Sequence, residues 1–144
     1  MLRMAEVRPE DTVYDLGSGD GRLVIEAALR YGARGVGVER EAKLVELARD
    51  RARRAGVADR VRFTQDDLFN TDMRGATVVT LYLLPRMMEQ LQPKLRAELP
   101  PGARIVSHDY PLPSWPLERS VTLDVEEKGF THGHTRADIF LYRR

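Results

Sequence analysis

Short apolar runs alternate with amphipathic segments along most of the chain. Five runs are β-prone, and each is bounded by Gly, Pro, Asp or Glu: 12–16, 35–39, 61–65, 76–84 and 103–109. Three segments between them place apolar residues at helical spacing: 21–30, 41–55 and 86–99. The residues expected to face the sheet are Leu23, Ala27 and Tyr31; Leu44, Leu47, Ala48 and Ala52; and Met87, Met88, Leu91 and Leu95. Strands that alternate with helices across short joints predict parallel βαβ units, and so an α/β fold.

The two ends of the chain depart from this alternation. Residues 1–8 have an apolar side and predict the end of a helix. Closely spaced prolines in the segment 111–116 predict an irregular loop, which contains Trp115. Beyond it, two runs between 121 and 141 carry an apolar residue at every second position. They predict an antiparallel hairpin at a sheet edge, which brings the number of strands to seven.

The step from the first predicted strand to the first predicted helix is rich in glycine. It reads D-x-G-x-G-x-G, from Asp15 to Gly21. Glycine permits positive φ and close approach of a ligand, and the free N–H groups of the next helix face the turn. A dinucleotide fingerprint would have glycine in place of Arg22, and carboxylates at Asp15 and Asp20 would repel a pyrophosphate. The turn therefore favours a cationic ligand such as S-adenosylmethionine, although a purely structural turn remains an alternative.

A second acidic marker follows the second predicted strand. Glu39 lies 18 residues after Gly21, close to the spacing of about 20 expected for an acid that binds ribose hydroxyls. The alternative is a solvated acid that opens the helix starting near Glu41. Next to the glycine turn, the ribose-binding interpretation is favoured.

The fourth predicted strand is the longest apolar run of the chain. Residues 76–84 are apolar on both faces, as in a central parallel strand, and Pro85 ends the run. Ligands of open α/β sheets bind outside the carboxyl ends of the strands, where the strand order switches. Tyr82 and Leu83 are therefore expected where a methyl donor and an acceptor meet. The alternative for Tyr82 is a place in the core.

Composition narrows the function further. The chain has 144 residues, the size of one domain, and its net charge of +1 gives no general attraction for nucleic acid. The absence of cysteine excludes disulfides, thiolate metal sites and a cysteine nucleophile. Arginines between 49 and 54 are expected to form a solvated helix face. No apolar stretch predicts a membrane span or a signal peptide, so a cytoplasmic enzyme is the simplest expectation.

These features resemble motif I and the following acids of class I S-adenosylmethionine-dependent methyltransferases. Three further segments are similar to small archaeal protein lysine methyltransferases of broad specificity, and to mitochondrial lysine methyltransferases of carrier and ATP synthase subunits: 76–85, 91–99 and 102–110. The resemblance covers nearly the whole chain. It implies one Rossmann-like domain over residues 1–144, with a mostly parallel seven-stranded sheet and an antiparallel C-terminal hairpin.

The resemblance also implies S-adenosyl-L-methionine as cofactor and a set of residues that bind it. In that pattern an acid just after the third strand accepts a hydrogen bond from the adenine amino group. Asp67 is favoured over Asp66 because Leu68 would then pack on the adenine, although an Asp pair that caps a turn is the alternative. The implied binding residues are Asp15, Gly17, Ser18, Gly19, Asp20, Gly21, Glu39, Arg40, Asp66, Asp67, Leu68 and Tyr82.

A lysine acceptor must be neutral to attack the methyl group, yet its free pKa is about 10.4. Desolvation in an apolar channel lowers that pKa. The residues expected to line such a channel beside Tyr82 are Leu83, Pro85, Tyr110 and Trp115. His108 or Asp109 would orient the amine or relay its proton, so the expected catalytic group is Tyr82, His108 and Asp109, with no obligatory general base.

The expected partner is a protein substrate, with no stable nucleic acid, no membrane and a homo-oligomer as an option. RNA or small-molecule methylation is an alternative, weakened because Leu83-Leu84-Pro85 replaces the Asn/Asp-Pro-Pro-Tyr/Phe motif of base methyltransferases. Relatives carry a proline-rich cover before the first helix, whereas this sequence starts inside the equivalent of that helix. A non-catalytic cofactor-binding subunit is therefore a third option. His132 and His134 predict a plain turn and no metal site.

The glycine turn yields a direct test of ligand class. With carboxylates at Asp15 and Asp20, the chain is expected to bind S-adenosylmethionine and its demethylated product, S-adenosylhomocysteine, in preference to NAD. Isothermal titration calorimetry with each ligand measures the three affinities. Tighter binding of NAD than of S-adenosylhomocysteine would contradict the prediction.

Overall fold

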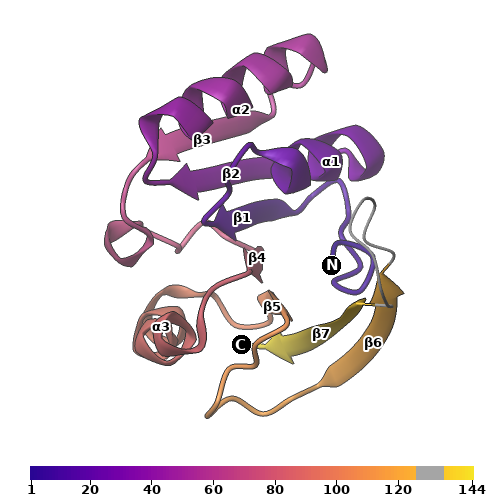
Figure 1. The fold of residues 1–144 in the computed structure, drawn as a ribbon, viewed down its shortest axis with the longest axis vertical. Coiled ribbons are helices and arrows are strands. Elements are labelled where there is room, and N and C mark those ends of the chain that lie inside the picture. Colours follow the sequence, from indigo (N-terminus) through magenta and orange to yellow (C-terminus); the bar gives the residue numbers. More distant parts are fainter. Residues whose placement is uncertain (126–134) are drawn as a thin grey trace.

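A single sheet of seven strands runs through the computed structural model, which describes residues 1–125 and 135–144 (Figure 1). The strand order is β3-β2-β1-β4-β5-β7-β6. The strands are β1 Thr12–Leu16, β2 Arg34–Glu39, β3 Val61–Gln65, β4 Val78–Leu81, β5 Arg104–His108, β6 Arg119–Val125 and β7 Thr135–Arg143. Strands β1 to β5 pair in parallel, and β7 pairs antiparallel with β5 and β6. The expected α/β fold with an antiparallel C-terminal hairpin is confirmed.

Helices cover both faces of the sheet, as its apolar parallel strands require. They are α1 Arg22–Tyr31, α2 Ala42–Arg54, α3 Pro85–Glu98 and the short 3₁₀ helix η1 Leu68–Asn70. Because side chains alternate along a strand, β1 contributes to two cores. Val13 shares a hydrophobic cluster with Ala27 of α1, whereas Leu16 shares another with Met88 of α3. Helices α1 and α2 lie side by side, away from α3 (Figure 1).

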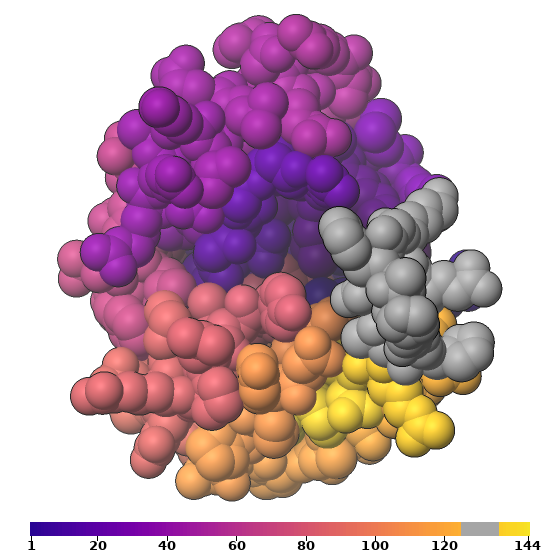
Figure 2. Space-filling view, viewed as in Figure 1, coloured from indigo at the N-terminus to yellow at the C-terminus, as the bar shows by residue number. Residues whose placement is uncertain are grey.

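The strand order reverses at β1, which pairs with β2 on one side and β4 on the other. The connections after β1 and β4 therefore diverge, and leave a crevice at the carboxyl ends of these two strands. Figure 2 shows the molecule hollowed where the indigo N-terminal part lies between magenta segments and the pink and orange segments. This topology fixes where a ligand site is expected.

Strand β4 is shorter than its apolar run predicts. The ladder ends at Leu81, which pairs with Leu16 of β1 and Ser107 of β5. Residues 82–84 then leave the sheet, and Pro85 opens α3, where a residue without N–H costs no hydrogen bond. The expected strand end at Leu84 is wrong, because apolar character alone does not show where the neighbouring strands stop.

The expected helix end at residues 1–8 is also wrong, since this segment forms turns. It is nevertheless fixed to the sheet by Arg104 of β5. The Arg104 guanidinium donates to the backbone oxygens of Ala5, at 2.6 Å, and Glu6, at 3.2 Å, and pairs with the buried Asp11 carboxylate. Side-chain hydrogen bonds thus anchor the segment in place of helical ones.

Two helix faces differ in detail from the prediction. On α2 the buried stripe is Val45, Ala48 and Ala52, whereas Leu47 is 44% exposed, so its expected inward position is wrong. Small side chains on that stripe let α2 approach β3 closely. On α1, Leu23 and Tyr31 are only partly buried and pack against the N-terminal segment. No helix within the described residues is long and apolar enough to cross a membrane.

Candidate functional site

The turn between β1 and α1 has the conformation that its glycines predict. Gly17, Gly19 and Gly21 have φ of +85°, +55° and +83°. The N–H groups of Gly17 and Ser18 donate to the Val38 carbonyl of β2, at 2.8 and 2.9 Å. A Cβ on Gly21 would lie 2.6 Å from the Phe63 ring, so only glycine fits there. A Cβ on Gly19 would meet nothing within 4 Å, and the turn is open at this point.

Glu39 reaches the glycine turn from the end of β2. Its Oε1 accepts a hydrogen bond from the Gly19 N–H at 3.1 Å, and its Oε2 accepts one from the Glu41 N–H at 2.9 Å. The sequence contained two markers, the glycine turn and the acid Glu39, and the structure brings them into contact. The acid also holds the segment that opens α2, so the two interpretations of Glu39 are compatible.

Asp15 lies beneath the same turn, at the carboxyl half of β1. The Thr80 hydroxyl of β4 donates to its Oδ1 at 2.8 Å. Burial raises the pKa of the Asp15 carboxyl to about 7; the Glu39 carboxylate also raises it, and the Thr80 hydrogen bond opposes the shift. Thr80 is the fully buried polar residue of an otherwise apolar strand, a signal that the sequence contained and the prediction missed.

Asp20 does not line the turn as a free carboxylate. Its Oδ2 pairs with Arg22 Nε at 2.7 Å and with a guanidinium nitrogen of Arg51, on α2, at 3.0 Å. The repulsion expected between Asp20 and a pyrophosphate is therefore wrong as an argument, because two cations neutralise this carboxylate. Asp15 and Glu39 remain as the acids that face the turn.

The acids after β3 serve the local chain. Asp66 Oδ1 accepts from the Asp67 N–H at 2.8 Å, and Asp67 Oδ1 accepts from the Phe69 N–H at 2.9 Å, which caps η1. The turn-capping alternative is therefore present in the structure, with the second oxygen of Asp67 left for an adenine. Leu68 is only 5% exposed, within the core on the α3 side, so it offers little surface to a ligand. The exposed Arg40 contributes its carbonyl to Gln65.

The segment after β4 borders the turn on the acceptor side. A Leu83 methyl carbon would lie 3.5 Å from a Cβ on Gly17, so Leu83 covers that glycine. Tyr82 is 63% exposed, which contradicts a place in the core. Its ring meets His108 of β5 edge to face, with centroids 4.4 Å apart. Leu84, next along the chain, is 65% exposed.

His108 and Asp109 lie together at the end of β5. His108 Nδ1 is buried and 3.2 Å from Asp109 Oδ2, without the geometry of a hydrogen bond. Asp109 has φ +66°, a conformation that is uncommon for a residue other than glycine. Its N–H donates to the Asp138 carbonyl at 2.7 Å, and its Oδ1 accepts from the Asp138 N–H at 3.2 Å. Strand β7 thus fixes the Asp109 carboxylate beside His108.

Trp115 lies elsewhere, and its expected role in a substrate channel is wrong. Its indole N–H donates to the Arg143 carbonyl at 3.1 Å, and Arg143 pairs with Arg104, at the amino end of β5. The Arg96 guanidinium of α3 stacks 4.5 Å above the ring. The loop after β5 therefore runs back along α3, away from the crevice. Tyr110 is 37% exposed next to His108, and Pro85 opens α3 near Leu83.

The turn meets the requirements of a nucleoside ligand such as the expected cofactor. Ser18 Oγ is buried and has no hydrogen-bond partner within the described residues. It lies against β2, because a Cβ on Gly37 would stand 2.7 Å from it, so the groups left for a ligand are the Glu39 carboxylate and the open backbone at Gly19. Within the described residues, no three His, Asp or Glu side chains are grouped to hold a metal ion. The predicted turn at His132 and His134 lies outside the described residues.

The position of Glu39 predicts a loss of cofactor affinity on its removal. The Glu39→Ala variant should bind S-adenosylhomocysteine about 1.5–3 kcal/mol more weakly, because a charge-assisted hydrogen bond to the ligand is lost. Asp67→Ala should cost less, since stacking of the adenine would survive. Calorimetry measures both affinities, with Glu39→Gln as the variant that keeps the acceptor oxygen. Unchanged affinity in Glu39→Ala would place the ribose elsewhere.

The raised pKa of Asp15 predicts a pH-dependent stability. The folded protein holds this proton up to about pH 7 and the unfolded chain only to about pH 4, so wild-type stability falls as the pH rises between these values. Asp15→Asn should therefore stabilise the unliganded protein by about 4 kcal/mol at pH 8, which is about three pKa units at 1.36 kcal/mol each, and by very little at pH 4. Urea unfolding at several pH values measures this. A gain that is independent of pH would show that Asp15 is ionised throughout.

Comparison with known proteins agrees with this site. A family model described as the ANTKMT methyltransferase domain matches residues 15–119. A protein-lysine N-methyltransferase of Saccharolobus islandicus is 40% identical over 144 residues, covering 99% of this chain and 84% of the relative. The adenine nucleotide translocase lysine N-methyltransferase of Mus musculus is 44% identical over 116 residues, covering 80% of this chain and 50% of the relative. The chain therefore spans about half the length of the mouse protein.

Solved structures give the same fold with a ligand. An RNA methyltransferase from Salinibacter ruber in complex with S-adenosyl-L-homocysteine superposes with a TM-score of 0.86 and 46% identity, covering 99% of this chain and 86% of that one. The C-terminal domain of precorrin-6Y C5,15-methyltransferase from Rhodobacter capsulatus shares the fold at a TM-score of 0.76 and 20% identity, and the match covers 99% of this chain and 85% of that one. The glycine turn, Glu39 and these relatives together show an S-adenosylmethionine-dependent methyltransferase that belongs to the ANTKMT methyltransferase family.

Proposed function

We propose that this methyltransferase acts on lysine side chains of proteins. The observation that carries the proposal is the exposed aromatic rim beside the cofactor turn. Tyr82 is 63% exposed, and its ring contacts His108. Tyr110 is 37% exposed, lies two residues after His108 and donates its N–H to the His108 carbonyl. Leu83 connects this rim to Gly17 of the turn. An acceptor that reaches the turn past these side chains would pass over apolar and aromatic surface.

Such a rim suits an alkyl amine. The aliphatic part of a lysine packs on Tyr82 and Leu83, and loss of water there lowers the pKa of its ammonium group from about 10.4 toward neutrality. Bound S-adenosylmethionine supplies an already activated methyl group, so the work left to the protein is alignment and desolvation. No strong general base is then required, since the protein selects the neutral amine from solution.

The His108–Asp109 pair is the polar group nearest to that rim. Because Asp109 is fixed through its backbone and one oxygen to Asp138, its second oxygen has a defined position 3.2 Å from His108 Nδ1. We assign Asp109 to orienting the incoming neutral amine and His108 to carrying to solvent the proton that the methylated ammonium product releases after the C–S bond has broken. Tyr82 positions the alkyl chain of the lysine between His108 and Asp109.

The relatives support a protein acceptor. Those from Saccharolobus islandicus and Mus musculus are named as lysine N-methyltransferases, one acting on adenine nucleotide translocase. The segment 81–85 contains no cationic side chain that would bind a phosphate, and its Leu83-Leu84-Pro85 sequence lacks the motif of base methyltransferases. The chemistry of the rim and the names of these relatives thus favour the same acceptor.

RNA is the second candidate acceptor, and one observation favours it. The Salinibacter ruber structure, 46% identical over nearly the whole chain, is titled an RNA methyltransferase. The net charge of +1 gives little general attraction for RNA, so an RNA acceptor would need a local cationic surface. A cofactor-binding subunit without activity of its own would label neither acceptor.

A transfer assay with labelled S-adenosylmethionine separates these functions. Lysine-rich protein should take up label and RNA should not, with activity that rises with pH toward the lysine pKa because the neutral amine is the reactant. Tyr82→Ala should lower transfer about tenfold, roughly 1.4 kcal/mol of barrier, with little change in S-adenosylhomocysteine binding. Leu117→Ala, an exposed apolar residue outside the rim, is the matched control. Label on RNA alone would overturn the lysine assignment.

A further inference from the structure

On its outer side, which faces α2, the cofactor turn is held by the ion pairs of Asp20. Asp20 Oδ2 lies 3.0 Å from a guanidinium nitrogen of Arg51 and 2.7 Å from Arg22 Nε. The two contacts are not equivalent. Arg22 is two residues from Asp20 and moves with the turn, whereas Arg51 projects from α2, which packs on β3. Of these two contacts, only the one with Arg51 links Asp20 to another element of the fold.

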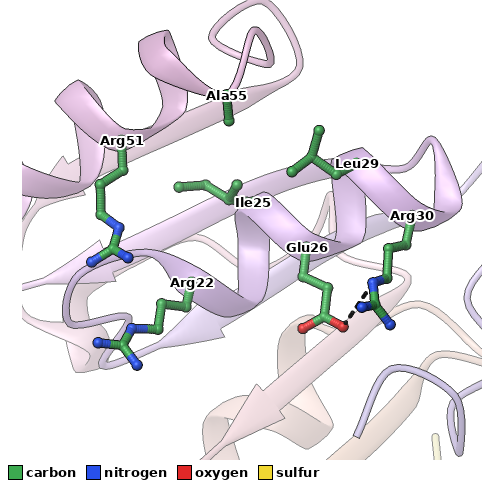
Figure 3. Close-up of a pocket in the computed structure, with 7 residues that line it drawn as sticks. All are labelled: Arg22, Ile25, Glu26, Leu29, Arg30, Arg51 and Ala55. Atoms are coloured by element: carbon green, nitrogen blue, oxygen red, sulfur yellow. Dashed lines mark ion pairs between the residues drawn. The ribbon is translucent and has the colours of Figure 1, made fainter.

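Both arginines stand at one end of a groove between α1 and α2. This groove has a volume of about 390 Å³, and Figure 3 shows Arg22 and Arg51 facing each other across it, with Ile25 between the helices and the Glu26–Arg30 pair farther along. It lies outside the crevice at the ends of β1 and β4. The Arg51 guanidinium thus reaches the cofactor turn from the side of α2, through Asp20.

The inner side of the turn has a different restraint. The Gly19 N–H donates to Glu39 Oε1, but Glu39 is also the acid expected to bind the ribose. When a ribose hydroxyl donates a hydrogen bond to Glu39, it competes with the Gly19 N–H for this carboxylate, and the inner restraint is weakened. The outer contact between Asp20 and Arg51 does not involve any group that faces the ligand, so it persists while Glu39 changes partners.

We propose that Arg51 is a positioning residue for cofactor binding, acting through Asp20 to hold the glycine turn in its ligand-binding conformation. The strength of the contact sets the size of the effect. The side chains of Arg51 and Asp20 are 41% and 22% exposed, so the pair is screened by solvent. Its loss should weaken binding roughly two- to fivefold, without unfolding the protein. The inference concerns the cofactor alone and does not depend on the acceptor.

The test compares two arginines of the same helix. Arg51→Ala should raise the dissociation constant of S-adenosylhomocysteine roughly two- to fivefold, and the KM for S-adenosylmethionine by a similar factor, with kcat nearly unchanged. Arg53→Ala removes the same charge from α2, but Arg53 pairs with Asp50 and does not touch the turn. It should bind as the wild type does. Arg51→Lys should recover part of the affinity, because a cation is kept without the planar guanidinium.

Two further readouts distinguish positioning from a general effect of charge. Asp20→Asn combined with Arg51→Ala should bind no more weakly than Asp20→Asn alone, because that substitution already removes the contact with Arg51. Added salt should weaken S-adenosylhomocysteine binding more in the wild type than in Arg51→Ala. Equal losses in the Arg51→Ala and Arg53→Ala variants, or additive losses in the double variant, would overturn the proposal.

Discussion

The site depends on the close contact between the glycine turn and the face of the sheet. At Gly21 the backbone lies so near to Phe63 of β3 and Ala48 of α2 that a side chain has no room, and its φ of +83° independently favours glycine. This contact sets the start of α1 over the sheet. Gly17 and Ser18, hydrogen-bonded to Val38, and the N–H of Gly19 then take fixed positions beside Glu39. A Cβ at Gly21 would push the turn away from the sheet and so move every N–H donor that faces the ligand.

The same site has a cost in stability. Asp15 is held in surroundings that raise its pKa to about 7, close to a second carboxylate. Such an arrangement disfavours the ionised, unliganded state, yet it provides negative potential for a ligand with a sulfonium and an ammonium group. Ser18 Oγ is likewise buried without a partner within the described residues. Both local conflicts lie in or beneath the cofactor turn, as expected of a functional site.

The acceptor side is organised by the C-terminal hairpin through β7. Asp138 holds Asp109 by two backbone hydrogen bonds and accepts a third from the Thr122 hydroxyl of β6. The cofactor side, in contrast, is built from β1, β2 and α2. The two halves meet through Leu83 above Gly17 and through Thr80 beside Asp15.

The sequence by itself determined the strand and helix alternation, the parallel sheet, the hairpin and the cofactor turn. These follow from local signals: short apolar runs, helical spacing, and glycines that need positive φ. The acid Glu39 was found for the same reason, because it lies at a fixed distance along one βαβ unit. Each of these features depends on residues that are close in sequence.

Only the tertiary structure decided the partners of polar groups and the course of irregular segments. The sequence does not show whether the Asp20 carboxylate faces a ligand or pairs with Arg51, which lies 31 positions away. Trp115 follows β5 closely, yet the loop returns along α3 to Arg143. Residues 1–8 have an apolar side in either a helix or turns, and Arg104 from a distant strand selects the turns. Long-range contacts choose among conformations that the local sequence leaves nearly equal in free energy.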